Sequence, residues 1–278
     1  MRIVAIGDNC LDVYVDQDLA TVGGNALNVA VNWARAGLTS CYYGAIGDDR
    51  AASIIRTVMS AVGLDPRFLV TIPGPTGVTL IRLVRNDREF LFEEFGVGAS
   101  WVPSADVITD LQAFDWIHTA GPLTTSGLVQ TLVAGPARVS VDLSTTRDFP
   151  QMDGVDIAFC SWTGPLDRGA HMLAESMISA GAVVAVVTCG AHGSLAHTNA
   201  AQTIAEAIPV SPVDTCGAGD SYISAFVHSY LRGLSTPDCL LEATRTATKT
   251  CMHLGSFRQQ HRTIPDWLKR DYYPSAVR

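Results

Sequence analysis

The chain of 278 residues lacks paired cysteine motifs. Its seven cysteines are scattered, their number is odd, and no two of them are spaced as C-x-x-C. This pattern argues against a disulfide framework or a zinc site, and it is typical of reduced, mostly buried thiols in a cytoplasmic protein. We therefore expect the protein to be cytoplasmic.

Long apolar runs are also missing. No stretch has the roughly 20 apolar residues that a membrane-spanning helix needs. The apolar run in MRIVAIGDNC is too short for a secretory signal, and Asp8 and Asn9 interrupt it at once. The sequence therefore predicts no membrane partner.

Positive charge is scarce. Nineteen Lys and Arg stand against 27 Asp and Glu, a net charge of −8, which argues against a partner made of nucleic acid. Lysine occurs only at Lys249 and Lys269, and neither completes a G-x-x-x-x-G-K-[ST] motif, so a P-loop is disfavoured. The sequence also has no G-x-G-x-x-G, G-x-S-x-G or H-E-x-x-H motif.

The sequence does contain an alternation of short apolar runs and longer helical patterns. RIVAIG (2–7), RVSVDL (138–143) and AVVAVVTCG (182–190) have the character of buried strands, and helical stretches lie among them. Such alternation predicts an α/β fold with a mostly parallel sheet and helices on both faces. Because no linker or repeat is visible, we expect one domain over residues 1–278.

A small accessory sheet is expected to form a lid on this domain. TGVTLIRLVRNDREFLFEEF has two strand-like arms around a plausible hairpin turn at Asn86-Asp87. Such a flap can close over a ligand and exclude water, and an ordinary edge hairpin is the alternative. We place the lid strands at about 12–22, 40–46 and 76–95.

The segment VDTCGAGDSYISAF (213–226) places glycines directly before an apolar helix. Gly217 and Gly219 permit backbone conformations that are costly for other residues, and the free N–H groups and dipole of the helix start favour an anion. Asp220, in the first turn, would face the same point, where a carboxylate can take the proton of a sugar hydroxyl during phosphoryl transfer. A plain glycine-rich turn with Asp220 as a helix-start residue is the alternative.

These residues resemble the C-terminal signature of the PfkB carbohydrate kinases, the ribokinase-like family. The resemblance implies a three-layer α/β/α fold with a β-sheet lid, and phosphorylation of a sugar hydroxyl with ATP and Mg²⁺. It implies that Asp220 is the catalytic base and that Gly217, Ala218 and Gly219 form the anion hole. Asp214 corresponds to a position beside a monovalent-cation site, for K⁺, in some members.

Two N-terminal segments, GDNCLD (7–12) and GGNALNVAVNWARAGL (23–38), also resemble family motifs. The resemblance implies that Asp12 holds sugar hydroxyls and that Gly24 and Asn28 contact the sugar. Carboxylate and amide groups can satisfy several hydroxyls, and paired glycines let the backbone approach the ring. Without the family, Asp12 would be read as a solvated loop residue and Asn28 as a surface helix residue. Further substrate-binding residues expected here are Asp8, Asn9, Gly23 and Asn25.

The nucleotide is expected against the C-terminal half. VTCGAHGSLAH (187–197) resembles the family's nucleotide-binding strand and turn, so Thr188, Gly190 and Gly193 are expected by the ATP. In EATRTATKTCMHLGS (242–256), Ala247 and Cys251 would border the adenine, and simple helix packing is the alternative reading of that pattern.

One departure concerns magnesium. Many members carry an Asn-x-x-Glu motif that acts through magnesium-bound water, and here Ser161 and Gly164 stand at those places. Ser161 is still expected at the nucleotide, and Asp167 is the nearby carboxylate that would substitute for the missing Glu.

Within the family, IGDNCLDVY, GGNALNVAV, NDREF and SVDLST are similar to the fructoselysine 6-kinase group. That similarity implies phosphorylation of the 6-hydroxyl of a glycated amino acid, whose amine needs an acidic or aromatic neighbour. Glu93, Glu94 and Trp101 are candidates in or near the lid, and we assign substrate binding to Glu94.

Two other functions stay open from the sequence. One is a kinase for ribose, fructose, a keto-deoxy sugar acid or a nucleoside. The other is a non-catalytic sugar-sensing protein on the same scaffold, which the missing Asn-x-x-Glu motif favours slightly. The expected partners are a small sugar and ATP. Because a lid sheet often needs a partner for its apolar face, we also expect a homodimer through the lid.

Overall fold

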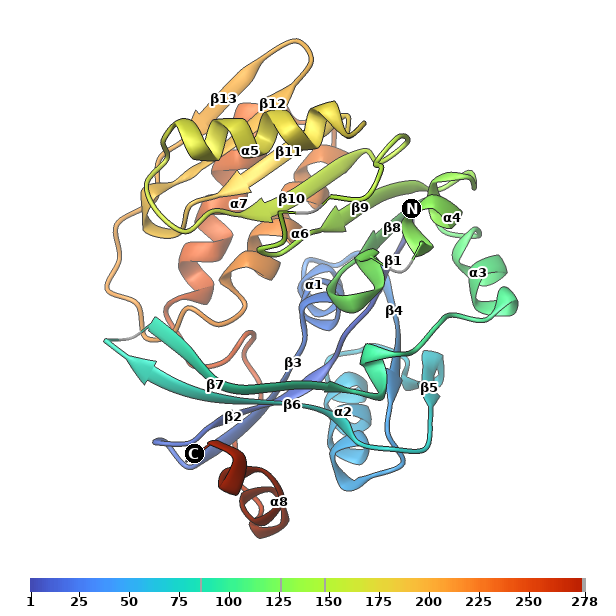
Figure 1. Cartoon of the computed structure of the whole chain (residues 1–278), viewed down its shortest axis with the longest axis vertical. Coiled ribbons are helices and arrows are strands. Elements are labelled where there is room, and N and C mark those ends of the chain that lie inside the picture. Colours follow the sequence, from blue (N-terminus) through green and yellow to red (C-terminus); the bar gives the residue numbers. More distant parts are fainter. Residues whose placement is uncertain (86, 126, 148, 277–278) are drawn as a thin grey trace.

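A nine-stranded sheet runs through the computed structural model, which describes residues 1–85, 87–125, 127–147 and 149–276 (Figure 1). Six of its neighbouring strand pairs are parallel and two are antiparallel, so the predicted mostly parallel α/β sheet is confirmed. Across the sheet the strands are β13 (Gln202–Ala205), β12 (Ser194–Thr198), β11 (Val184–Thr188), β10 (Ile157–Ser161), β9 (Arg138–Asp142), β8 (Trp116–Thr119), β1 (Arg2–Ile6), β4 (Thr39–Ile46) and β5 (Leu69–Thr71).

Helices cover both faces of this sheet, as predicted (Figure 1). Alternate side chains of β1 enter two separate cores, Ile3 in one and Val4 in the other, because successive strand residues point to opposite faces. Helices of the first core include α1 (Asn25–Arg35), α6 (Ala218–Leu231) and α7 (Thr236–Thr250). Those of the second include α3 (Ala105–Leu111), α4 (Leu128–Val133) and α5 (Arg168–Ser179). Short 3₁₀ helices are η1 (Pro66–Phe68), η2 (Val97–Ala99), η3 (Gly121–Thr125) and η4 (Gly190–His192).

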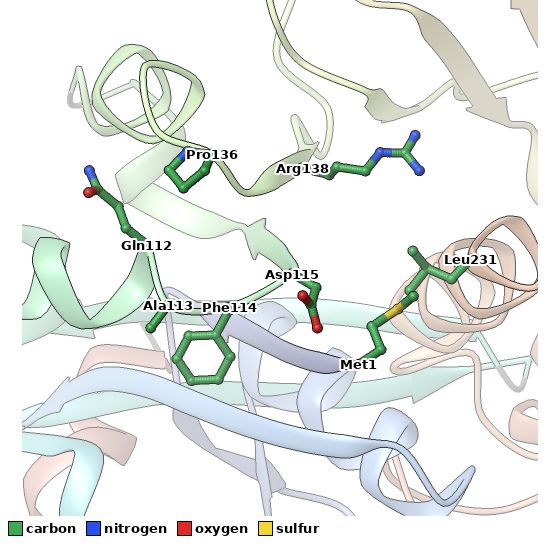
Figure 2. A pocket seen from close by; sticks show the side chains of 8 residues that line it. All are labelled: Met1, Gln112, Ala113, Phe114, Asp115, Pro136, Arg138 and Leu231. Atoms are coloured by element: carbon green, nitrogen blue, oxygen red, sulfur yellow. The ribbon is translucent and has the colours of Figure 1, made fainter.

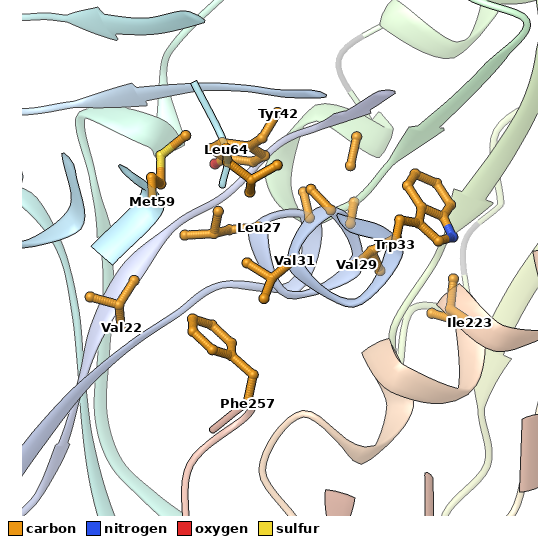
Figure 3. Packing of buried hydrophobic residues seen from close by; sticks show 14 of the residues in the cluster. Val22, Leu27, Val29, Val31, Trp33, Tyr42, Met59, Leu64, Ile223 and Phe257 are labelled. Carbon is orange, nitrogen blue, oxygen red and sulfur yellow. The ribbon is translucent and has the colours of Figure 1, made fainter. Parts of the chain in front are cut away.

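Helix α1 is held tightly between the sheet and α6. Figure 3 shows Leu27, Val31 and Trp33 of α1 within the first core, with Phe257, from the loop after α7, packed below Val31. The indole Nε1 of Trp33 donates a hydrogen bond of 3.0 Å to the carbonyl of Ser224 in α6. This packing holds α1 and α6 against each other.

A second sheet of five strands lies beside the first. Its order is β14 (Arg262–Thr263), β3 (Leu19–Gly23), β2 (Cys10–Tyr14), β6 (Thr76–Val84) and β7 (Asp87–Gly96). Residues 40–46, which we expected in the lid, lie instead in the central sheet as β4. The reason is that β4 pairs with β1 in parallel and buries Tyr42 and Tyr43 on its two faces. Asn86 of the predicted hairpin turn lies outside the described residues, and the single-domain organisation stays a prediction.

The apolar face of the five-stranded sheet is covered within the same chain. Leu11 and Leu80 are fully buried in the first core, together with Ile55 of α2 (Arg50–Ala61) and Leu268 of α8 (Asp266–Ala276). The reason for expecting a dimer, an apolar lid face without a cover, therefore does not hold. A homodimer stays a prediction that now needs other support.

A surface depression lies at the amino ends of the parallel strands. It has a volume of about 710 Å³, and Figure 2 shows Met1, Asp115 and Arg138 around it. Arg138 pairs with Asp156 at 2.7 Å and lies over the rings of Trp116 and Tyr230, so its charge is already engaged. This edge is opposite to the carboxyl ends, where open α/β sheets bind their ligands.

No helix in the described ranges is long and apolar enough to cross a membrane.

Candidate active site

The carboxyl ends of the parallel strands gather polar side chains at one edge of the sheet. Asp8 follows β1, Asp142 ends β9, and Ser161 and Thr188 end β10 and β11. Asp220, in the first turn of α6, lies close enough to Asp142 and Asp8 for their charges to raise its pKa. The structure thus brings residues from both halves of the chain to one edge.

Asp220 is the centre of this group. It is 7% exposed, and its Oδ2 accepts a hydrogen bond of 2.7 Å from Nδ2 of Asn28. Burial raises the pKa of Asp220 to about 8, and the hydrogen bond from Asn28 opposes that rise. The Oδ1 of Asn28 accepts a hydrogen bond of 2.9 Å from the hydroxyl of Ser256, which fixes the amide's orientation.

The turn before α6 presents free backbone N–H groups. Gly217 has a φ of 72°, and a Cβ there would lie 2.4 Å from the Cβ of Ser256, so both conformation and space require glycine. Ala218 donates its N–H to the carbonyl of Thr215 at 3.2 Å, so its predicted part in an anion hole is not supported by a free group. Among the described residues, none accepts a hydrogen bond from the N–H of Gly217, Gly219 or Asp220.

Asp214 braces this turn. It is fully buried, and its carboxylate accepts hydrogen bonds from the hydroxyl of Tyr14 at 2.7 Å and from the N–H groups of Gly255 and Cys216 at 2.8 and 2.9 Å. Three donors therefore occupy most of its acceptor capacity. A monovalent cation beside Asp214 stays a prediction.

Asp12 belongs to a polar row across the five-stranded sheet. Strand pairing sets Thr21, Asp12, Thr79 and Glu93 side by side on β3, β2, β6 and β7, and laterally paired residues point to the same face. The carboxylate of Asp12 accepts hydrogen bonds from the thiols of Cys10, at 3.2 Å, and of Cys216, at 3.8 Å.

Burial raises the pKa of Asp12 to about 7, and the charges of Asp214 and Asp8 add to that rise. Because Cys216 belongs to the turn before α6, its contact with Asp12 shows that the polar row faces Asp220's side of the molecule.

Asp8 and Asn9, two predicted sugar contacts, make hydrogen bonds within the protein, and their contact with sugar stays a prediction. The Oδ1 of Asn9 is buried and has no hydrogen-bond partner among the described residues. The carboxylate of Asp8 accepts hydrogen bonds from the N–H groups of Asn25, at 2.8 Å, and Ala26, at 3.2 Å, and so caps α1. The amide nitrogen of Asn9 donates to the hydroxyl of Tyr42 and to the carbonyl of Ala45, both at 2.9 Å. The short polar loop after β1 therefore holds the start of α1 through Asp8, and it is anchored to β4 through Asn9.

Gly23 and Gly24 allow the turn into α1 to pass close to this loop. A Cβ on Gly23 would lie 2.0 Å from Oδ2 of Asp12, and one on Gly24, whose φ is 113°, would lie 2.4 Å from the Cα of Asn9. The paired glycines thus have a packing role, and their contact with sugar, like that of Asn25, stays a prediction.

The strand register argues against Glu94 as a substrate contact, and its assignment to substrate binding stays a prediction. Glu94 pairs with Val78, on the face opposite to the polar row, and its charge acts on Tyr272 of α8. Glu93 lies on the row itself, and partial burial together with the charge of Asp8 raises its pKa. Trp101 is buried in the second core.

The predicted nucleotide residues lie in two groups. The hydroxyls of Ser161 and Thr188 are 3.2 Å apart at the ends of neighbouring parallel strands. Gly190 and Gly193 follow with φ values of 53° and 99°. The carbonyl of Cys251 accepts the N–H of Val213 at 2.7 Å, which ties the end of α7 to the segment that leads to Asp214. Ala247 lies on α7 and is half-buried. The contact of each of these residues with ATP stays a prediction.

Three residues near the site were missed from the sequence. Asp142 is 8% exposed, and burial raises its pKa to about 6. Among the described residues, only its Oδ1 accepts a bond, from the N–H of Ser144 at 2.8 Å. Arg147 donates a hydrogen bond of 2.8 Å to the carbonyl of Ser161. The signal was an Asp that ends a predicted buried strand, with an Arg five residues on, in SVDLSTTR.

The third missed residue, Arg88, joins the lid to the turn before α6. Its Nη1 donates to the carbonyl and the hydroxyl oxygen of Thr215 at 3.1 and 3.0 Å, and the hydroxyl of Thr215 donates to Asp87 Oδ1 at 2.5 Å. The positive charge of Arg88 lowers the pKa of Asp220. The tip of the β6–β7 hairpin is therefore locked onto the segment that carries the free N–H groups.

A preformed metal cluster is not present within the described ranges, where no three His, Cys, Asp or Glu side chains group as ligands. Asp167, the proposed substitute for the missing Glu, caps α5 by accepting the N–H groups of Gly169 and Ala170. Asp142 fits a divalent cation better, because it is buried and its Oδ2 accepts no hydrogen bond within the described residues, and carboxylate oxygen is the ligand that Mg²⁺ prefers.

Comparison with known proteins places this geometry in a family context. The sequence model of the pfkB family carbohydrate kinases matches residues 3–138 and 162–260. The chain is 30% identical to the fructoselysine 6-kinase of Escherichia coli over 259 residues, 92% of this chain and 99% of that protein. It is also 30% identical to the fructosamine kinase FrlD of Bacillus subtilis over 267 residues, 92% of this chain and 93% of that protein.

Solved structures share the fold. The ribokinase of Arabidopsis thaliana, complexed with ribose and ATP, superposes with a TM-score of 0.76 over 91% of this chain and 93% of that one, at 18% identity. The microbiome-derived acarbose kinase Mak1 superposes with a TM-score of 0.78 over 100% of this chain and 99% of that one, at 19% identity.

Proposed function

The chain belongs to the pfkB family of carbohydrate kinases and is an ATP-dependent sugar kinase, and from this premise we propose that it phosphorylates the 6-hydroxyl of fructoselysine or a related glycated amino acid. The 30% identity to proteins named fructoselysine 6-kinase and fructosamine kinase, over nearly the whole chain, supports this substrate class. The observation that carries the mechanism is the buried pair of Asp220 and Asn28 beside free N–H groups at the start of α6.

In this proposal the sugar lies between the polar row of the lid and the start of α6. Asp12 and Asn28 hold its hydroxyls, and Asp220 takes the proton from the hydroxyl that is phosphorylated. The raised pKa of Asp220 suits the task, because a general base works best when its pKa is near the working pH. A positively charged amine on the substrate would be held by Glu93, which is exposed at the outer end of the row.

The transferred phosphoryl group is proposed to meet the N–H groups of Gly217 and Gly219. Such oriented donors, together with the helix dipole, stabilise the charge that develops during transfer. Apart from its chain neighbours and the backbone of α6 itself, no described atom lies within 4 Å of the place where a Cβ on Gly219 would stand, so a ligand atom has room there. Arg88, already at Thr215, would add positive charge on the lid side.

ATP is proposed to lie along the ends of β10 and β11. Ser161, Thr188 and Arg147 would contact its phosphates, and Gly190, Gly193, Ala247 and Cys251 would border the ribose and adenine. Asp142 would hold Mg²⁺ together with the phosphate oxygens, since a metal ion in such a site neutralises phosphate charge and orients the nucleotide.

A coupled assay that follows ADP release tests this function. We expect turnover with fructoselysine and other glycated amino acids at a higher kcat/KM than with fructose, ribose or a nucleoside. The assay is run with and without K⁺, which tests the cation expected beside Asp214. Equal turnover of fructose and fructoselysine would contradict the substrate class, and no turnover on any sugar would favour a sensing protein.

The variant Asp220→Asn separates catalysis from binding in that assay. We expect kcat to fall by roughly 10²–10⁴-fold, the usual contribution of a general base, while sugar affinity measured by calorimetry stays within a few fold. Undiminished kcat in this variant would remove Asp220 from the proposed role.

A further inference from the structure

A basic depression lies between the C-terminal ends of α1 and α7, and neither Ala247 nor Cys251, the α7-end residues assigned to the nucleotide, lines it. Its volume is about 390 Å³, enough for a small ligand. Four side chains that carry or can carry positive charge line it, and none of the seven described lining residues is acidic. The four are Arg35, Lys249, His253 and Arg258. The depression is thus locally positive, although the chain as a whole carries a net charge of −8.

The positive charge in this basic depression is not neutralised by the protein. In the part of the chain that the structure describes, none of Arg35, Lys249 and Arg258 forms an ion pair. Arg35 donates instead to the carbonyl of Arg258 and lies over the ring of Phe257, 5.2 Å from its centroid. Partial burial and the nearby charge of Arg258 lower the pKa of Arg35. The larger depression of Figure 2 differs, because Arg138 there is paired with Asp156.

The loop that carries the basic depression also braces the active site. Residues 251–258 leave α7, and Phe257 anchors them against α1 (Figure 3). On their inner side, the N–H of Gly255 binds Asp214, and the hydroxyl of Ser256 binds Asn28, which in turn binds Asp220. Only one residue, Phe257, separates Ser256 from Arg258 in the chain.

We propose that the basic depression binds a small phosphate-bearing metabolite and that this binding is transmitted through residues 251–258 to Asn28 and the turn before α6. A phosphate group fits because it brings two negative charges and several acceptor oxygens to three cations that form no ion pair within the described residues. The site is outside the residues assigned to sugar and ATP, and it does not depend on which sugar the enzyme takes.

Calorimetric titration with pyrophosphate tests the binding, in magnesium-free buffer at constant ionic strength. We expect one site in the wild-type protein and at least tenfold weaker binding in the double variant Lys249→Gln/Arg258→Gln. Lys269→Gln is the matched control, since it removes the chain's other lysine, on α8, and should bind as the wild type does. Gly219→Ala, which obstructs the proposed anion hole, should also keep this binding.

Several outcomes would overturn the site. Absent binding in the wild type at millimolar pyrophosphate, or undiminished binding in the double variant, would remove it. An equal loss in Lys269→Gln would show a general charge effect. Loss in Gly219→Ala with retention in the double variant would place the anion at the start of α6.

Hydrogen–deuterium exchange with inorganic phosphate tests the transmission without using activity. We expect slower exchange over residues 251–258 and over 217–221 in the wild type, and no change in the double variant. Protection confined to 251–258 would overturn the coupling to the active site.

Discussion

Asn28 donates a hydrogen bond of 2.7 Å to Asp220 across 192 residues of sequence, and this bond joins the first turns of α1 and α6. This hydrogen bond lowers the pKa of Asp220, because a hydrogen bond donated to the ionised carboxylate favours the charged form. Burial pushes the pKa of Asp220 up and Asn28 pulls it down, and the balance lies at about 8. The ionisation of the proposed base is therefore set by one amide that Ser256 holds in place.

The pH dependence of kcat/KM follows from this balance. Only the ionised form of Asp220 can accept a proton, so we expect kcat/KM for the sugar to rise with pH and to level off above about 8. In Asn28→Ala the lost hydrogen bond should move the midpoint to higher pH, in addition to any loss of sugar affinity. Rates are measured from pH 6 to 9 with the coupling enzymes in excess; a flat profile, or a midpoint that falls in Asn28→Ala, would contradict this account.

Two glycines of the same turn should respond differently to alanine. At Gly219 a Cβ meets open space, and alanine is a better helix residue than glycine, so Gly219→Ala should be stabilised by up to about 1 kcal/mol. The same Cβ would stand where we place the phosphoryl group, so we expect kcat/KM for ATP to fall at least tenfold.

Gly217→Ala is the comparison for this pair. Its φ of 72° and the 2.4 Å approach to Ser256 predict losses of both stability and activity. Thermal unfolding and kinetics of both variants check the pair. Full activity in Gly219→Ala would show that the phosphoryl group does not approach this point.

The sequence was sufficient to predict the central sheet and the start of α6. The apolar runs at 2–7, 138–143 and 182–190 correspond to β1, β9 and β11 in the structure. They were recognisable because a strand that is buried on both faces has a nearly continuous apolar sequence. Gly217 was predictable because only glycine readily adopts the left-handed conformation found there. Residues 40–46 were misplaced because a short apolar run does not say which of two sheets it joins.

The faces of the lid could not be read from the sequence. Glu93 and Glu94 are adjacent, so they point to opposite faces, and the strand register decides which one meets the site. That register shifts between Leu80 and Ile81, where β7 carries an irregularity that no turn residue signals. Asp142 was missed for a similar reason: its importance comes from Asp8 and Asp220, which lie far away in sequence.

The lock between the lid and the turn before α6 predicts a role for Thr215. Thr215→Val keeps the side-chain shape and removes the hydroxyl that donates to Asp87 and accepts from Arg88. We expect a roughly three- to tenfold lower kcat/KM for the sugar, since a weakened hydrogen bond to a charged group costs about 1 kcal/mol or more. Thr109→Val on α3 is the control for a lost hydroxyl, because the hydroxyl of Thr109 donates to the carbonyl of Ala105 in the same helix. Equal kinetics in Thr215→Val and the wild type would show that the lock is dispensable.

The opposite faces of Glu93 and Glu94 give a test of substrate recognition with a built-in control. Both substitutions, Glu93→Gln and Glu94→Gln, remove one negative charge from the same strand, but only Glu93 lies on the row with Asp12. We expect Glu93→Gln to raise the KM for fructoselysine about three- to tenfold, the range of a partly exposed charge contact, and to leave the KM for fructose unchanged. Glu94→Gln should change neither value. If both variants behave alike, or if Glu93→Gln affects fructose equally, Glu93 does not bind the amine, and the distinction between glycated amino acids and plain sugars must come from another part of the lid.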